Sequence, residues 1–147
     1  MGMLDQSTKL DFQKSATGFS IGDTPSTNVY DTADPNSTEI GLNDNLWLNA
    51  QVNTAITSGG SATLQAVLQD SADNSAWADV LAGPVVTLAN LVAGTQLLLV
   101  NPPVGTRRYV RVVWRVATAA LTGGTLSAFL SLDAQKNVFR NSGFAVV

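Results

Sequence analysis

The chain has 147 residues, a formal net charge of −3 and only 13% charged side chains, against 45% hydrophobic ones. This length suits one domain with a sizeable core, and the low charge leaves Ser, Thr, Asn, Gln and Gly to supply most of the surface polarity. The sequence lacks cysteine, which excludes disulfides and thiolate metal sites, and it lacks histidine, the commonest general base and metal ligand.

Residues 1–45 are rich in Asp, Asn, Ser, Thr, Gly and Pro and show neither a helical nor a strand period. We expect an extended N-terminal arm or long loops, packed on the domain or on a neighbouring subunit. Scattered apolar residues could dock into grooves, with Phe12 and Phe19 as the principal anchors. The first 15 residues carry acids and lysines where a secretory signal needs an apolar segment, so no export signal is expected.

An alternating pattern begins at residue 46 and predicts two half-buried strands joined by a glycine-bearing turn at 58–61. In the second strand, Gln65 and Gln69 are expected to face outward. The residues expected to face inward are Leu46, Leu48, Ala50, Val52 and Ile56 in the first strand and Leu64, Ala66 and Leu68 in the second.

Residues 80–106 contain no charged side chain and resemble a membrane helix on a hydropathy scale. Gly83, Pro84, Gly94 and the pair Pro102–Pro103 divide this segment into apolar runs much shorter than the about 20 residues that span a bilayer. Buried strands separated by turns are therefore expected, and no membrane association.

Residues 105–116, GTRRYVRVVWRV, hold four of the eight basic residues and alternate with a period of two. The expected dry side carries Arg108 and four residues that should fill the core: Val110, Val112, Trp114 and Val116. The expected wet side carries Arg107, Tyr109, Arg111, Val113 and Arg115. We expect Arg107, Arg111 and Arg115 to meet carboxylates of a partner protein or of the acidic arm, because a planar guanidinium pairs bidentately with a carboxylate.

A turn at Thr122–Gly124 and a last strand follow, with Leu126, Ala128, Leu130 and Leu132 on one face. Both Gly-Gly pairs, at 59–60 and 123–124, are predicted to be hairpin turns. About seven strands, spaced roughly ten to fifteen residues apart, indicate an all-β antiparallel β-sandwich. The sandwich is expected to occupy residues 46–135, followed by a tail at 136–147.

Two acidic segments offer oxygen ligands that calcium prefers. One contains Asp31, Asp34, Glu39 and Asp44, and the other contains Asp70, Asp73 and Asp79. Neither has the EF-hand spacing, and Asp and Asn also form turns without a metal, so calcium binding stays open. We expect no catalytic residues, no metal and no cofactor, and hence no enzyme.

The charge is polarised along the chain. Residues 1–106 hold two lysines and ten acids, whereas residues 107–147 hold six basic residues and one acid. The isoelectric point of about 4.5 and the lack of a nucleic-acid-binding motif speak against nucleic acid as the partner. Acidic and basic surfaces on one chain are typical of complementary protein contacts.

The order of four segments resembles the capsid cement, or head decoration, proteins of short-tailed bacteriophages. These segments are STNVYDTAD, LQAVLQDSADNSAWADV, GTQLLLVNPPVGTRRYVRVVWRV and GGTLSAFLSLDAQ, and the resemblance runs from about Met3 to Gln135. It implies a jelly-roll fold and a non-enzymatic protein on the outside of an icosahedral head. Its partner would be the major capsid protein, whose subunits it would bridge, as a homodimer or another symmetric homo-oligomer. The protein would be made in the host cytoplasm and reside in the virion.

A lectin-like β-sandwich on a virion is the alternative. Trp47 and Trp77 could form a sugar platform if both lie on one exposed surface, whereas burial of Trp77 against the sheet favours a purely structural role.

Overall fold

The computed structural model describes residues 9–32, 47–103 and 105–131, whose regular structure is almost entirely β-strand. One short 3-10 turn, η2 (Leu88–Asn90), interrupts the strands. The first sheet contains β1 (Lys9–Ser15), β4 (Trp47–Ser58), β8 (Gln96–Val100) and β10 (Leu121–Ser131). The second sheet contains β2 (Gly22–Pro25), β3 (Tyr30–Asp31), β5 (Thr63–Ser71), β6 (Ala78–Ala82), β7 (Val86–Thr87) and β9 (Tyr109–Ala117).

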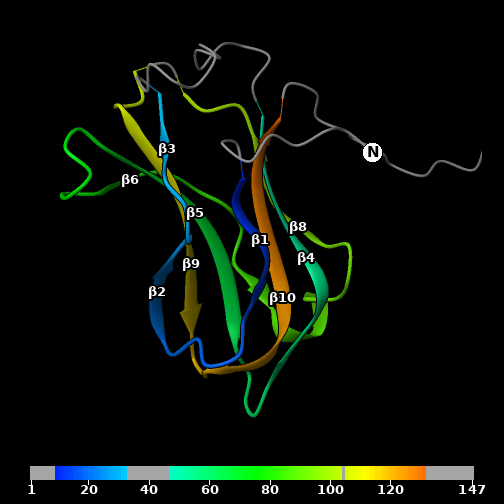
Figure 1. The fold of residues 1–147 in the computed structure, drawn as a ribbon. Coiled ribbons are helices and arrows are strands. Elements are labelled where there is room, and N and C mark those ends of the chain that lie inside the picture. The colour runs from blue at the N-terminus through cyan, green and yellow to red at the C-terminus, as the bar shows by residue number, and fades with distance from the viewer. Residues whose placement is uncertain (1–8, 33–46, 104, 132–147) are drawn as a thin grey trace, which may run out of the picture.

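The strand orders are β1-β10-β4-β8 and β2-β9-β5-β6, and neighbouring strands run antiparallel. β3 also pairs with β9, and β7 also pairs with β5. Figure 1 shows the sheets as two layers, and the chain crosses between them from β4 to β5, from β8 to β9 and from β9 to β10. This is the strand order of a jelly roll, so the predicted antiparallel β-sandwich is confirmed.

The core lies between the two sheets and is filled by the inward residues of their central strands. Trp114 in β9 is fully buried and is the largest side chain enclosed. The other predicted inward residues that the structure describes are also buried: Leu48, Ala50, Val52, Ile56, Leu64, Ala66, Leu68, Val110, Val112, Val116, Leu126, Ala128 and Leu130. Leu46 and Leu132 lie outside the described residues.

The expectation of an N-terminal arm is wrong for residues 9–32. They form β1 at the edge of the first sheet and β2 and β3 on the second, so this segment is part of the sandwich. The strand period is hidden because β1 changes register twice along β10, and because β2 and β3 are only four and two residues long. The rest of residues 1–45, and the tail at 136–147, lie outside the described residues.

The second Gly-Gly pair is not a turn. Gly123 and Gly124 lie inside β10, where the pairing with β4 shifts register. Gly124 has φ +103°, and a Cβ there would approach the carbonyl oxygen of Ala55 to 2.7 Å. Glycine inside a strand commonly marks such a bulge. The first pair, Gly59–Gly60, lies between β4 and β5, but the prediction of a hairpin turn is wrong there too, because these two strands belong to different sheets and the chain crosses from one sheet to the other.

Candidate interaction surface

β9 lies in the middle of the second sheet, between β2 and β3 on one side and β5 on the other. Its outward positions are therefore flanked on both sides. Arg111 lies opposite Gln69, and Arg115 lies opposite both Gln65 and Asp23.

Val113, between the two arginines, is buried rather than wet, together with its cross-strand partner Val67. The pairs on either side, Gln69–Arg111 and Gln65–Arg115, have side chains long enough to cover this apolar pair.

Arg107 is engaged with Asp70 at the end of β5. Its Nη2 donates to Asp70 Oδ1 at 2.6 Å, its Nε donates to the same oxygen at 2.9 Å, and its backbone N–H donates to Oδ2 at 2.9 Å. These hydrogen bonds lower the pKa of the buried Asp70 carboxyl. Arg107 therefore ties the turn before β9 to β5, rather than presenting a free guanidinium.

Arg115 bridges two acids from different strands. Its Nε and Nη2 donate to the two oxygens of Asp23 at 2.7 and 2.9 Å, and Nη2 also donates to Asp79 Oδ2 at 3.1 Å. The hydrogen bond from Arg115 lowers the pKa of Asp23, and the same contacts raise the pKa of Arg115. Because Asp23 belongs to β2 and Asp79 to β6, the bridge spans the whole width of the sheet.

Arg108 does not lie on the dry side of β9, because it precedes the strand and is exposed. Its Nε and Nη2 donate to the two oxygens of Asp31 at 2.8 and 2.9 Å, and its guanidinium lies 4.9 Å from the ring centre of Tyr109. Three of the four arginines at 107–115 are thus paired with carboxylates of the same chain.

Arg111 is the exception. Its Nε and Nη2 donate to the amide oxygen of Gln69 at 3.0 and 2.9 Å, and its guanidinium lies 4.1 Å from the ring centre of Trp77. Gln69 is in turn fixed through its Nε2, which donates to Asp79 Oδ1 at 2.7 Å. Within the described ranges, Arg111 forms no ion pair with a carboxylate. Burial lowers its pKa from the usual arginine value.

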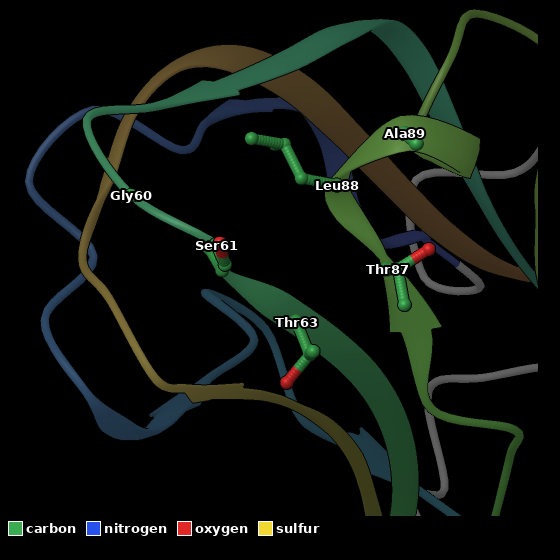
Figure 2. Close-up of a pocket in the computed structure, with 7 residues that line it drawn as sticks. Gly60, Ser61, Thr63, Thr87, Leu88 and Ala89 are labelled. Carbon is green, nitrogen blue, oxygen red and sulfur yellow. The ribbon is translucent and has the colours of Figure 1, made fainter.

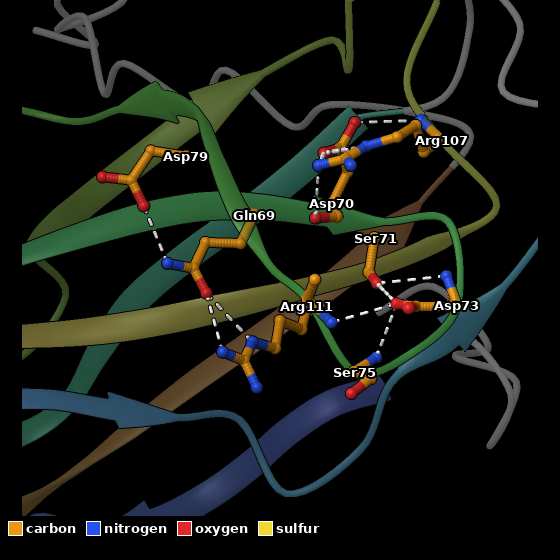
Figure 3. Close-up of polar contacts among 9 residues, drawn as sticks. Gln69, Asp70, Ser71, Asp73, Ser75, Asp79, Arg107 and Arg111 are labelled. Carbon is orange, nitrogen blue, oxygen red and sulfur yellow. Dashed lines mark hydrogen bonds and ion pairs between the residues drawn. The ribbon is translucent and has the colours of Figure 1, made fainter.

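The loop between β5 and β6 is held by Asp73 (Figure 3). Its Oδ1 accepts the backbone N–H groups of Ser75 and Ala76 at 3.0 and 2.9 Å and the hydroxyl of Ser71 at 3.0 Å, which lowers the pKa of Asp73. Asn74 takes a left-handed conformation with φ 60°, as Asn often does in tight turns. This loop places Trp77 next to the guanidinium of Arg111.

The carboxylates predicted as possible calcium ligands are directed to different partners. Asp70 accepts hydrogen bonds from Arg107, Asp73 accepts them from its own loop, and Asp79 accepts them from Gln69 and Arg115. Across residues 9–32, 47–103 and 105–131, no three potential metal-ligating side chains gather in one place. Asp34, Glu39 and Asp44 lie outside the described residues.

The two predicted phenylalanine anchors have different surroundings. Phe12 in β1 is 59% exposed, with Lys9 Nζ at 4.8 Å from its ring centre, and remains available to a partner. Phe19 is only 7% exposed and belongs to the core of its own chain. Its side chain is therefore not available to a partner.

The outer surface of the first sheet carries no charge at the outward positions of its central strands β4 and β10. These positions include Trp47, Asn49, Gln51, Asn53, Ser127, Phe129 and Ser131. Asn49 Oδ1 is enclosed and is the one buried side-chain oxygen or nitrogen of the described residues that has no hydrogen-bond partner. Trp47 lies on the outer face of the first sheet, whereas Trp77 lies in the β5–β6 loop against Arg111 on the outer face of the second sheet. The two side chains therefore do not form the shared platform that the lectin alternative requires.

A shallow hollow of about 440 Å³ lies at one end of the sandwich, between the β4–β5 turn and η2 (Figure 2). Its lining, which includes Ser61, Thr63, Thr87 and Leu88, contains no titratable side chain. The hollow therefore offers no acid, base or charged group for catalysis. Among the described residues, no helix has the length and apolar character needed to cross a membrane.

These observations define a jelly-roll β-sandwich whose second sheet carries a polar network and whose first sheet carries an uncharged surface. A family model, Bbp16, matches residues 16–130, and the chain belongs to this family. The family name suggests a phage protein. No curated protein matches the chain.

The local sequence pattern does not identify the groups that position Arg111, namely Gln69, Trp77 and Asp79. The alternation of β5 did place Gln69 on the outward face. Its pairing with Arg111 depends on how β5 and β9 align, which a local pattern does not specify.

Proposed function

We propose that this protein is a structural virion protein, a cement or decoration protein on the outside of an icosahedral phage head. In this role it bridges subunits of the major capsid protein and catalyses no reaction. Its location would be the virion, after synthesis in the host cytoplasm. The family name and the resemblance of the four sequence segments support the phage assignment.

One structural observation carries the binding role: the uncharged outer surface of β4 and β10. The centres of lasting protein interfaces are depleted in charged residues and enriched in aromatic ones. Here Trp47 and Phe129 lie on a surface whose other outward residues are amides and hydroxyls.

A bridging protein needs at least two contact surfaces, and the sandwich has two different outer faces. Many copies on a repeating lattice would also strengthen attachment through avidity. We include in the proposal a symmetric homo-oligomer, such as a dimer, because oligomers of identical chains most often have closed symmetry.

The test is co-sedimentation of the purified protein with phage heads that lack it, with its mass in solution measured in parallel. Gln51→Lys places a charge on the uncharged surface and should weaken binding at least about tenfold, since burying an unpaired charge is costly. Ala89→Lys, on the exposed η2 turn, is the matched control and should bind like the wild type. If the wild-type protein does not sediment with the heads, the proposed function is refuted.

A further inference from the structure

We propose that the guanidinium of Arg111, held between Trp77 and Gln69, is a docking point for a carboxylate side chain of the partner protein. This inference rests on the proposed function and names the chemistry of one contact. It concerns the second sheet, on the side of the sandwich opposite the uncharged surface.

Arg111 retains hydrogen-bonding capacity that the described residues of its own chain do not use. A guanidinium has five N–H donors. In Arg111, Nε and Nη2 donate hydrogen bonds, and both bonds go to one neutral oxygen, Gln69 Oε1. Figure 3 shows these contacts from two of its three nitrogens. Arg107, Arg108 and Arg115 each contact an aspartate oxygen at 2.6 to 2.8 Å instead.

The side chain is fixed before any partner arrives. The ring of Trp77 lies 4.1 Å from the guanidinium carbon, within the range of a cation–π contact, and Gln69 is itself only 7% exposed and anchored by Asp79. Asp73 holds the loop that carries Trp77. A side chain fixed in this way loses little conformational entropy on binding, so a contact with it is stronger than one with a freely moving arginine.

The geometry favours a carboxylate over a phosphate. A phosphate group carries more charge and is usually held by several donors, whereas the neighbouring Arg107 and Arg115 are already engaged by aspartates. A single planar guanidinium with free donors matches the two oxygens of one carboxylate.

The surrounding charges predict how this contact affects the kinetics. Arg111 and Arg115 are balanced by Asp23 and Asp79, so the face has no large excess of positive charge to attract a partner from a distance. Loss of Arg111 should therefore act mainly on the dissociation rate rather than on the association rate.

The decisive variant is Arg111→Met, which removes the charge and keeps a long apolar side chain over Trp77. Arg108→Met is the matched control, because it removes a charge from an exposed pair with Asp31. Affinity is measured on heads lacking the protein, both native and after conversion of their carboxylates to neutral amides with a carbodiimide and glycinamide. A thermal melt confirms that each variant is folded.

On native heads, Arg111→Met should bind about tenfold to a hundredfold more weakly than the wild type, the range of one hydrogen-bonded charge pair. Arg108→Met should bind within about twofold of the wild type. On amidated heads, the wild type and Arg111→Met should bind equally. If Arg111→Met does not fold, Arg111→Lys replaces it, and the loss of the planar guanidinium should still weaken binding several-fold.

Equal binding of wild type and Arg111→Met to native heads would overturn the docking role and leave the proposed function intact. A difference that persists on amidated heads would overturn the carboxylate as the occupant. If the wild type binds no heads at all, the proposed function fails and this inference fails with it.

Discussion

Trp114 and Asp11 join the two sheets through the core. The indole Nε1–H of Trp114 in β9 donates to Asp11 Oδ2 in β1 at 2.7 Å, across 103 positions of sequence. The second oxygen, Oδ1, accepts the backbone N–H of Thr27 at 2.8 Å and lies 3.7 Å from Lys14 Nζ. A carboxylate at 3% exposure thus has hydrogen-bond partners on both oxygens, as a buried charge requires.

Asp11→Asn should destabilise the protein by about 2 kcal/mol, although the side chain keeps its shape. An amide has only one acceptor oxygen, so its NH₂ group would face either the Thr27 N–H or the Trp114 Nε1–H. Urea unfolding measures the loss. In a double-mutant cycle with Trp114→Phe, the two losses should not add, and additive losses would show that the bond contributes nothing specific.

Gly124→Ala should destabilise the protein by about 1 to 3 kcal/mol. The added Cβ would lie 2.7 Å from both the Ala55 carbonyl oxygen and Ile56 Cδ1, at a backbone φ of +103°. Gly59→Ala is the matched control in the β4–β5 turn, because its Cβ would meet nothing within 4 Å. Thermal unfolding should therefore separate the two variants, and equal melting temperatures would contradict the bulge geometry.

Phe19→Ala should lower the unfolding free energy strongly, whereas Phe12→Ala should leave it almost unchanged. Phe19 is buried in the core, so its truncation should cost about 3 to 5 kcal/mol of unfolding free energy. Phe12 is 59% exposed, so its truncation should change stability by less than about 0.5 kcal/mol. Denaturant unfolding distinguishes them. A large loss for Phe12→Ala would mean that its side chain is covered in the free protein.

Acid should destabilise the fold through Asp23 and Asp70. Both have pKa values below the usual range because of hydrogen bonds from Arg115 and Arg107. A carboxyl whose pKa is lower in the folded state stabilises the fold above its unfolded pKa of about 3.9, and this contribution is lost as the pH falls through the folded value. Stability from these pairs should stay constant from about pH 5 to 8 and decline below about pH 4.

Asp70→Asn provides the check on this pH dependence. It should lower the unfolding free energy at pH 7 by about 1 kcal/mol and make the decline below pH 4 shallower than in the wild type. Unfolding free energies at a series of pH values test both effects. Parallel curves for the two proteins would mean that the Arg107–Asp70 pair does not carry the pH dependence.

The sequence predicted the central strands well because burial on one face leaves a period of two, as in Trp114 and its neighbours in β9. It failed at β1 because bulges break that period, and Gln13 even takes a left-handed conformation. It singled out Arg107, Arg111 and Arg115 but not the differences among them. Those differences depend on which side chains of β2, β5 and β6 lie beside β9, and long-range alignment determines this.

The side-chain network on the second sheet also bears on how the chain folds. Gln69 and Arg111 are 42 positions apart, and pairing between strands so far apart in the sequence is slow. A slip of β9 by one residue along β5 would turn Arg111 and Arg115 toward the apolar interior and separate each from its acceptors at once. The network therefore penalises misaligned pairing of β5 with β9 during folding, so that one register of these two strands is selected over its neighbours.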